Sequence, residues 1–214
     1  MTNVVPVFAC PTDEWLPLDI HDPDGVQEVV RQVVDRGGWS NRRYAKAVTP
    51  HVRRVWNSLQ EGRKGPAAVY VPHERPKELG RSLPSVSTAW RHPQKMGSTL
   101  AEVSENMSQP EPGRKRVVTK VELPAGPACR VYHETTFVIP DLNLTFHVTG
   151  VSHYLFPEKG PRKILAMLAD WDTHTPLTGL VEMADQIAAT LTLHPRTLER
   201  PDGWVIPAAK TIES

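Results

Sequence analysis

The chain has 214 residues, 39% of them hydrophobic, and a formal net charge of +1 at pH 7. This size and composition suffice for one sizeable core, so we expect a single domain over residues 1–214. The near-zero charge provides no overall field to attract nucleic acid, and no apolar run approaches the roughly 20 residues of a membrane-spanning helix. The two cysteines, Cys10 and Cys129, argue against a disulfide scaffold and favour a reducing, cytoplasmic location. The N-terminus lacks the basic and long apolar regions of a signal peptide.

Residues 1–66 are predicted to be mainly helical, after an extended lead-in over residues 1–23. Valines at helical spacing predict a first helix over residues 26–34, ended by Gly37-Gly38. A second helical region spans residues 40–59, where we expect Pro50 to interrupt the helix and Thr49 to cap its restart. Its outer face is basic, which we interpret as a solvated surface because no aromatic stacking platform accompanies it. The basic residues are Arg42, Arg43, Lys46, Arg53 and Arg54.

A short strand is expected over residues 67–71, followed by a proline-rich insert over residues 72–113. Within the insert, Thr99 and Glu102 are spaced as a capping box and predict one short helix. The rest reads as a long loop, and loops of this length are usually functional or disordered. We therefore expect the insert to be the least protected segment and a contact site for a partner.

From residue 114 to 194 the pattern indicates an antiparallel sheet followed by a helix. Alternating residues predict strands over 116–123, 129–134 and 144–156, with a bulge at Gly150. An unbroken apolar run from Ile164 to Ala169 predicts a further strand over 163–171, although periodicity alone leaves a short buried helix open. Short turns between consecutive strands indicate a meander. An apolar stripe predicts a helix over residues 176–193, with Thr175 as its cap, and residues 195–214 read as a tail. The fold class is therefore α+β: an antiparallel meander packed by N-terminal helices and a C-terminal helix, an α/β/α sandwich.

This order of elements resembles the PsbP-like α/β/α fold. The resemblance rests on a helix followed by a meander whose last strand ends in Asp-x-x-Thr-Pro before a helix, at Asp172 to Pro176. In particular the chain is similar to the actinobacterial proteins related to the LpqN lipoproteins, mainly over residues 115–193. The resemblance implies an accessory, assembly or binding role. It implies no shared catalytic motif, and no functional residue is carried over from it.

One cluster of residues offers chemistry. Asp170, Asp172 and His174 share a strand face if the strand continues, with successive neighbours about 7 Å apart. Such a set can hold a divalent ion or perform acid/base catalysis. The structural alternative, which we favour, is a polar strand exit in which an aspartate accepts from backbone N–H groups in the turn.

Other candidate sites are discounted on geometry. Six residues separate His147 from His153, roughly 20 Å along a strand, so the two cannot share one metal. Cys129 and His133 lie about 13 Å apart on one strand face, too far for a thiolate–imidazole pair. The chain has none of the common nucleotide, metalloprotease or hydrolase motifs, and we expect no cofactor and no metal.

Two functions from different classes are compatible with the sequence. The first is a non-catalytic accessory, binding or assembly protein that acts through protein–protein contacts on a sheet face, a groove or the insert. The alternative is a small metal-dependent or acid/base enzyme centred on Asp170, Asp172 and His174. The first explains both the absence of motifs and the long insert. The sequence identifies neither a partner nor an oligomeric state.

Overall fold

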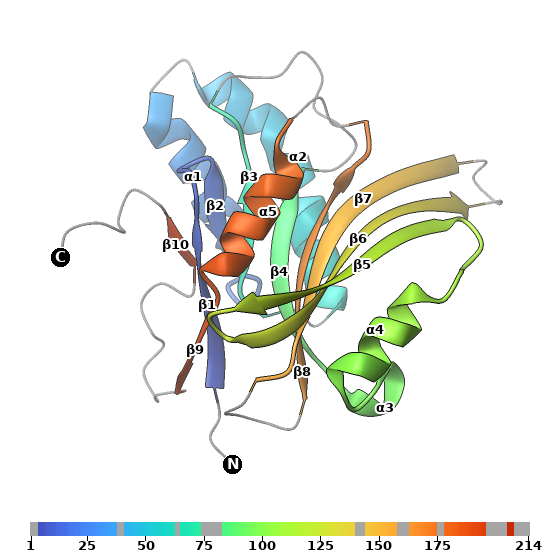
Figure 1. The fold of residues 1–214 in the computed structure, drawn as a ribbon. Coiled ribbons are helices and arrows are strands. Elements are labelled where there is room, and N and C mark those ends of the chain that lie inside the picture. Colours follow the sequence, from blue (N-terminus) through green and yellow to red (C-terminus); the bar gives the residue numbers. More distant parts are fainter. Residues whose placement is uncertain are drawn as a thin grey trace.

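A seven-stranded antiparallel sheet, in the strand order β2-β3-β4-β8-β7-β6-β5, forms the middle of the protein (Figure 1). The computed structural model describes residues 4–37, 41–62, 65–73, 83–139, 144–157, 163–174, 178–195 and 205–207. The strands are β2 (Trp15–Leu18), β3 (Ala67–Tyr70), β4 (Ser85–Arg91), β5 (Arg114–Leu123), β6 (Gly126–Ile139), β7 (Leu144–Leu155) and β8 (Ile164–Asp172). The predicted α+β class is thus confirmed.

Strand β3 contributes alternate residues to two cores. Ala68 and Tyr70 of β3 belong to a cluster that includes α5 (Leu180–Ala189), whereas Ala67 and Val69 pack against α1 (Gly25–Gly37) and α2 (Asn41–Glu61). Because successive strand residues point to opposite sides, the helices lie on opposite faces of the sheet. We refer to these as the α5 face and the α2 face. The predicted packing by N-terminal helices and a C-terminal helix is confirmed.

The meander from β5 to β8 agrees closely with the expected strands. The β5–β6 hairpin closes where Leu123 pairs with Gly126, and β7 pairs with both β6 and β8. The expected bulge at Gly150 is wrong: Gly150 pairs in regular register with His133 on one side and Asp170 on the other. The missing side chain at Gly150 instead leaves room for the side chains of His133 and Asp170.

The second half of the proline-rich insert contains a strand where a loop is expected. Residues 85–91 form β4, which lies between β3 and β8 and is hydrogen-bonded to both. Val86, Thr88 and Ala89 are buried, so this stretch is a central strand and not a loop. Residues 74–82 lie outside the described part. The expectation that the whole insert is weakly protected is therefore wrong for β4, because pairing on both sides holds it in the sheet.

Two helices follow β4 and cover the far end of the α2 face. These are α3 (Pro93–Met96) and α4 (Leu100–Ser108). The Thr99 hydroxyl accepts a hydrogen bond from the Glu102 backbone N–H at 3.2 Å, which confirms the predicted cap. The Glu102 carboxylate accepts from the backbone N–H and the hydroxyl of Ser98. Val103 of α4 then packs on Cys129, Val131 and Ile164 of the sheet.

The N-terminal helices α1 and α2 pack together over β2 and β3 (Figure 1). The predicted interruption at Pro50 is wrong, since α2 runs unbroken from Asn41 to Glu61 with Pro50 inside it. The Thr49 hydroxyl, predicted to cap a restarted helix, instead donates to the Ala45 carbonyl at 2.8 Å. Pro50 is exposed, while Val48 and Val52 on either side are fully buried. Packing of these valines holds the helix straight through a residue that alone would break it.

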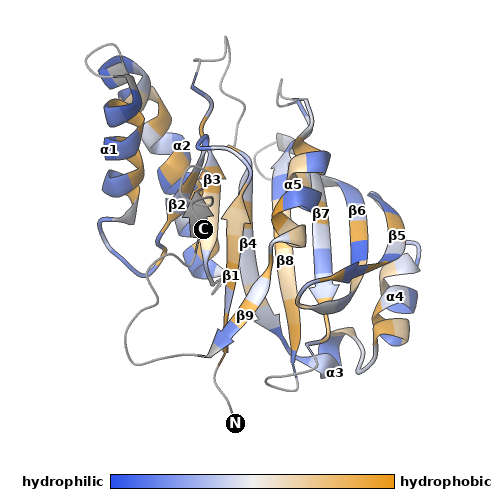
Figure 2. Ribbon diagram, turned by 60° about the vertical axis from the view of Figure 1, so that its left-hand side comes forward, coloured by the Kyte–Doolittle hydropathy of each residue, from blue (hydrophilic) through white to orange (hydrophobic). Residues whose placement is uncertain are grey.

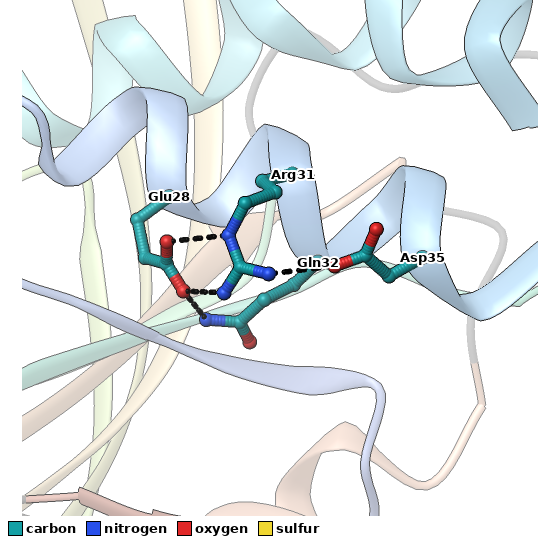
Figure 3. A network of polar contacts seen from close by, with 4 residues as sticks. All are labelled: Glu28, Arg31, Gln32 and Asp35. Atoms are coloured by element: carbon teal, nitrogen blue, oxygen red, sulfur yellow. Dashed lines mark hydrogen bonds and ion pairs between the residues drawn. The ribbon is translucent and has the colours of Figure 1, made fainter.

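The outer surface of α1 carries a small charged network (Figure 3). Arg31 donates to both carboxylate oxygens of Glu28, at 2.9 and 2.6 Å, and to Asp35 at 2.7 Å. Gln32 also donates to Glu28, at 2.9 Å. All these pairs lie three or four residues apart on an exposed helix, where each contributes only a few tenths of a kcal/mol. The network stabilises α1 locally and forms no site.

The C-terminal helix is shorter than predicted. It begins at Leu180, after Gly179 in a left-handed conformation, and ends at Ala189. The predicted cap Thr175 and the first position Pro176 lie outside the described residues. Leu191 is fully buried as the apolar stripe requires, but it follows the helix, and Leu193 belongs to strand β9 (Thr192–Pro195). The helical spacing therefore predicted the burial correctly and the C-terminal boundary incorrectly.

A second, three-stranded sheet with the order β10-β1-β9 accompanies α5 on the α5 face (Figures 1 and 2). Strand β1 (Val4–Cys10) pairs antiparallel with β9 and parallel with β10 (Val205–Pro207). Phe8 and Cys10 enter the same core as α5. The expected extended lead-in is thus a paired strand. The predicted tail contains at least one strand, in which Ile206 pairs with Ala9.

Candidate functional site

A histidine–aspartate pair spans three strands of the α2 face. His133 on β6 and Asp170 on β8 flank β7, and the His133 Nε2 lies 3.2 Å from the Asp170 Oδ1. Between them is Gly150, where a Cβ atom would stand 2.5 Å from the Asp170 Oδ1 and 2.7 Å from the His133 Cε1. The two side chains meet above β7 only because Gly150 has none. Asp170 retains 46% exposure and His133 18%, so the pair reaches the surface.

The three predicted site residues separate. Asp170 and Asp172 have the even spacing expected of one strand face, but their partners differ. Asp172 accepts a hydrogen bond from the His174 backbone N–H at 2.9 Å, which is the turn interaction of the structural alternative. The His174 ring packs edge-on against His147 of β7, with ring centroids 5.4 Å apart. Within the described ranges, no three His, Cys, Asp or Glu side chains are grouped closely enough to hold a metal ion.

The other histidine pair also has distinct surroundings. His153 is 2% exposed, and its Nε2 lies 3.2 Å from the Asp185 Oδ1 on α5. Arg130 of β6 donates to both Asp185 oxygens, at 2.7 and 2.8 Å. Burial by itself would raise the pKa of Asp185, but the hydrogen bonds and charges of His153 and Arg130 outweigh it and lower that pKa to about 2. This trio joins α5 to the sheet, and its groups already satisfy one another.

The cysteines are packing residues on opposite faces. Cys10 lies in the core of the α5 face and Cys129 under α4 on the α2 face. Both thiols are free. Burial raises the pKa of Cys10 to about 12 and raises that of Cys129 as well. The protonated thiol is a poor nucleophile, so neither cysteine offers reactive chemistry.

A polar hollow of about 340 Å³ opens near the far ends of β5, β6 and β7. On the α5 face it is lined by Glu134 and Thr136 of β6 and by His147 of β7. Thr136 and His147 are hydrogen-bonded to each other at 3.1 Å. Residues 113–115 and Thr173 close its rim. In the sequence His147 stands out only as half of a discounted metal pair, and this lining depends on cross-strand register that no local pattern reveals.

Two exposed valines lie on the same face as the hollow. Val117 of β5 is 50% exposed and Val138 of β6 is 63% exposed, and both belong to the α5 face because Val117 pairs with Tyr132 on β6. Tyr132 and Val138 are six residues apart, roughly 20 Å along β6. The α5 helix meets β6 at Arg130, so the strand runs on beyond it, as Figure 1 shows. We call this surface the wing face, defined by Val117, Tyr132, Glu134, Thr136, Val138 and His147.

The fold and surface define an α+β protein with an antiparallel sheet, helices on both faces and an open stretch of sheet at one end. No protein-family model and no curated protein matches the chain. Among solved structures, the chain is similar to the crystal structure of LpqN, involved in cell envelope biogenesis of Mycobacterium tuberculosis. The match has 12% sequence identity and a TM-score of 0.44 and covers 89% of this chain and 84% of LpqN. LpqN-related proteins are also the group that the order of sequence elements resembles. None of the helices in the described ranges is long and apolar enough to cross a membrane.

Proposed function

We propose that this is a non-catalytic accessory or binding protein that acts through protein–protein contacts, and that its partner binds the wing face. The observation that carries the proposal is the exposure of Val117 and Val138, 50% and 63%, on one sheet face. Single exposed apolar residues are ordinary on protein surfaces. Two on one open sheet face, on either side of a polar hollow, are the arrangement expected of a contact surface.

The chemistry of the wing face specifies the kind of partner. Burying a fully exposed valine contributes about 1.5–3 kcal/mol. Val117 and Val138 are 50% and 63% exposed, so covering them provides the corresponding fraction as binding energy. Between them Glu134, Thr136 and His147 supply hydrogen-bonding groups that require matched polar groups. A protein segment with two apolar side chains about 20 Å apart and polar groups between them fits this pattern.

The test is purification from native lysate with three variants of the tagged protein. Val117→Asp and Val138→Asp each place a charge on the wing face, which must be desolvated on binding. Lys46→Asp on the exposed surface of α2 is the control, because it also introduces an aspartate at an exposed site but lies on the opposite face. Each variant is first shown to unfold at the wild-type urea midpoint.

We expect a defined set of proteins to co-purify with the wild type and with Lys46→Asp, and to be lost from both valine variants. Retention of the same proteins by Val117→Asp and Val138→Asp would place the contact elsewhere and refute the wing face. Deletion within the insert is not a usable test, since residues 85–91 form β4 in the middle of the sheet.

One observation favours the alternative, an acid/base enzyme. A histidine with a carboxylate partner is the arrangement of a general base, and the pair of His133 and Asp170 is accessible at the surface. This moves the alternative from Asp170, Asp172 and His174 to Asp170 and His133. Hydrolysis of an activated ester by the wild type, lost in His133→Ala and kept in His174→Ala, would establish it. Equal background rates in all three proteins would leave the binding function alone.

We also propose that the protein works in a reducing, cytoplasmic environment. Its two cysteines are unpaired and lie on opposite faces of one sheet, so they form no disulfide that would require an oxidising compartment. Fractionation of the native cells with an antibody against the protein tests this. Recovery in the envelope fraction would contradict it.

A further inference from the structure

We infer that two copies of this chain associate through the outer edge of β5, so that the two sheets continue into one another. The inference concerns the edge of the sheet and shares Val117 with the wing face, so Val138, which lies off β5, is the residue that separates the two proposals. Strand β5 spans Arg114–Leu123 and is the last strand in the order of the sheet, paired with β6 on its inner side. Within the described residues no strand pairs with its outer side. A ten-residue edge of this kind is a template for another strand.

Symmetry restricts the registers that such a pair can adopt. Two identical antiparallel strands are related by a two-fold axis perpendicular to the sheet, so each residue opposes one on the same face. The axis must therefore pass between one residue of β5 and the same residue of the second copy. With the axis at Thr119, Val117 opposes Val121 of the second copy and Arg116 opposes Glu122.

The charges on β5 favour the Thr119 register over its neighbours. An axis at Val118 would set Arg116 opposite Lys120 of the second copy, and an axis at Lys120 would set the two Lys120 side chains against each other. Like charges directly opposite destabilise a strand pair, whereas opposite charges contribute roughly 0.2–1 kcal/mol. At Thr119 the pair of Arg116 and Glu122 occurs twice by symmetry and no like-charged pair arises. Arg116 already lies 2.7 Å from Glu111 of its own chain, so it would be shared between Glu111 and Glu122 of the second copy.

Burial on the α5 face points to the same register. Val117 is half exposed, while Val121 is partly buried against the core under α5. In the Thr119 register Val117 of each copy covers Val121 of the other, so an isolated apolar side chain extends an existing core. Because the strands meet only at their edges, the contact is small, and we expect dissociation at concentrations on the order of micromolar.

Cysteine cross-linking tests the register. Thr119→Cys places the two new thiols directly opposite each other, at a Cα separation of about 4.5–5.5 Å that suits a disulfide. In Val117→Cys the two thiols are four residues apart along the strands, about 13 Å, and out of reach. Because Cys10 and Cys129 are buried, they add little background. We expect a covalent dimer under mild oxidation from Thr119→Cys and not from Val117→Cys.

Sedimentation velocity on the protein without the introduced cysteines tests the association itself. We expect dimer to form between about 1 and 100 µM and Glu122→Arg to weaken it at least tenfold. Glu61→Arg, the same charge change at the exposed end of α2, should leave it unchanged. A wild type that stays monomeric over that range overturns the dimer, and cross-linking by Val117→Cys in place of Thr119→Cys overturns the register. Loss of the wing-face partner in Val138→Asp with dimerisation intact separates this inference from the proposed function, since Val138 is not on β5.

Discussion

At the scale of single residues, Gly150 shows how one missing side chain determines a surface. A Cβ at this position would lie 2.6 Å from the Ala169 carbonyl oxygen, besides meeting Asp170 and His133. The sequence offered the right signal, an isolated glycine in a strand pattern, but that signal has two meanings. It marks either a bulge or a close approach of neighbouring groups. Only the register of three strands distinguishes them.

We predict that Gly150→Ala destabilises the fold by about 1–3 kcal/mol, because the methyl group overpacks the row and drives His133 and Asp170 apart. Urea denaturation measures the loss. His133→Ala alone should cost less than about 1 kcal/mol, since its partner Asp170 is half exposed. The double variant should recover part of the Gly150→Ala loss. An unchanged urea midpoint for Gly150→Ala would mean that His133, Gly150 and Asp170 are loosely packed across the three strands.

The Asp185 trio makes stability depend on pH in acid. Its pKa in the folded protein is about 2, below the ordinary value of 3.8, so the carboxylate stabilises the fold fully above pH 3.8. That contribution is lost as the pH falls from 3.8 through 2. Since the side chain is 39% exposed, we discount the full linkage value and expect about 1–2 kcal/mol.

Unfolding by urea at pH values from 5 down to 2 measures this contribution, and the prediction is a difference between variants. Asp185→Asn should be less stable than the wild type at pH 5 and approach it as the pH falls. Asp35→Asn on the exposed side of α1 is the control and should run parallel to the wild type. A constant gap between Asp185→Asn and the wild type would show that the carboxylate's charge is not what matters.

At the scale of elements, β4 is the strand that the sequence pattern does not predict. Its residues Val86, Thr88 and Trp90 alternate as a strand should, but prolines at positions 84 and 93 bracket it and the surrounding charges read as loop. We predict that the amides of residues 85–91 exchange with solvent as slowly as those of β8, because both strands are paired on two sides. Hydrogen-exchange mass spectrometry resolves the two peptides. Fast exchange in β4 alone would remove it from the stable sheet.

The elements that sequence reasoning recovered are those with local signals. Strands β5 to β8 alternate clearly and are joined by short turns, and α1 and α4 carry apolar stripes and a cap. Strand β1 gave no comparable signal, since its partners β9 and β10 lie more than 180 residues away. For the site, register is the missing information. The Asp170 partner His133 is 37 residues distant, and nothing near Asp170 in the chain identifies it.

At the scale of the whole molecule, two cores share one sheet. Ile187 of α5 and Val48 of α2 are both fully buried, but on opposite faces. Strand β3 contributes to both cores, so loss of one exposes the backing of the other. The division of the sequence into an N-terminal helical part and a C-terminal sheet part is therefore a division of the chain, and we propose that the whole folds as a single domain.

We predict that Ile187→Ala costs about 2–4 kcal/mol and Val48→Ala about 1–3 kcal/mol, from lost burial plus the cavity left behind. Each variant should shift one cooperative transition, followed by both far-ultraviolet circular dichroism and tryptophan fluorescence. Separate transitions for the two probes, with each variant moving only one of them, would show two independently folding units.

The pairing of β1 with β9 has a consequence for the newly made chain. Val7 pairs with Thr192, so β1 must wait for a strand that is synthesised much later. At translation speeds of about 5–20 residues per second, this wait lasts roughly 10–40 seconds, during which an apolar β-prone segment around Phe8 has no partner. Chains arrested at residue 179 should therefore aggregate during synthesis, and arrested chains that also lack residues 4–10 should aggregate less. Ribosome-associated holding factors would have this segment around Phe8 to protect.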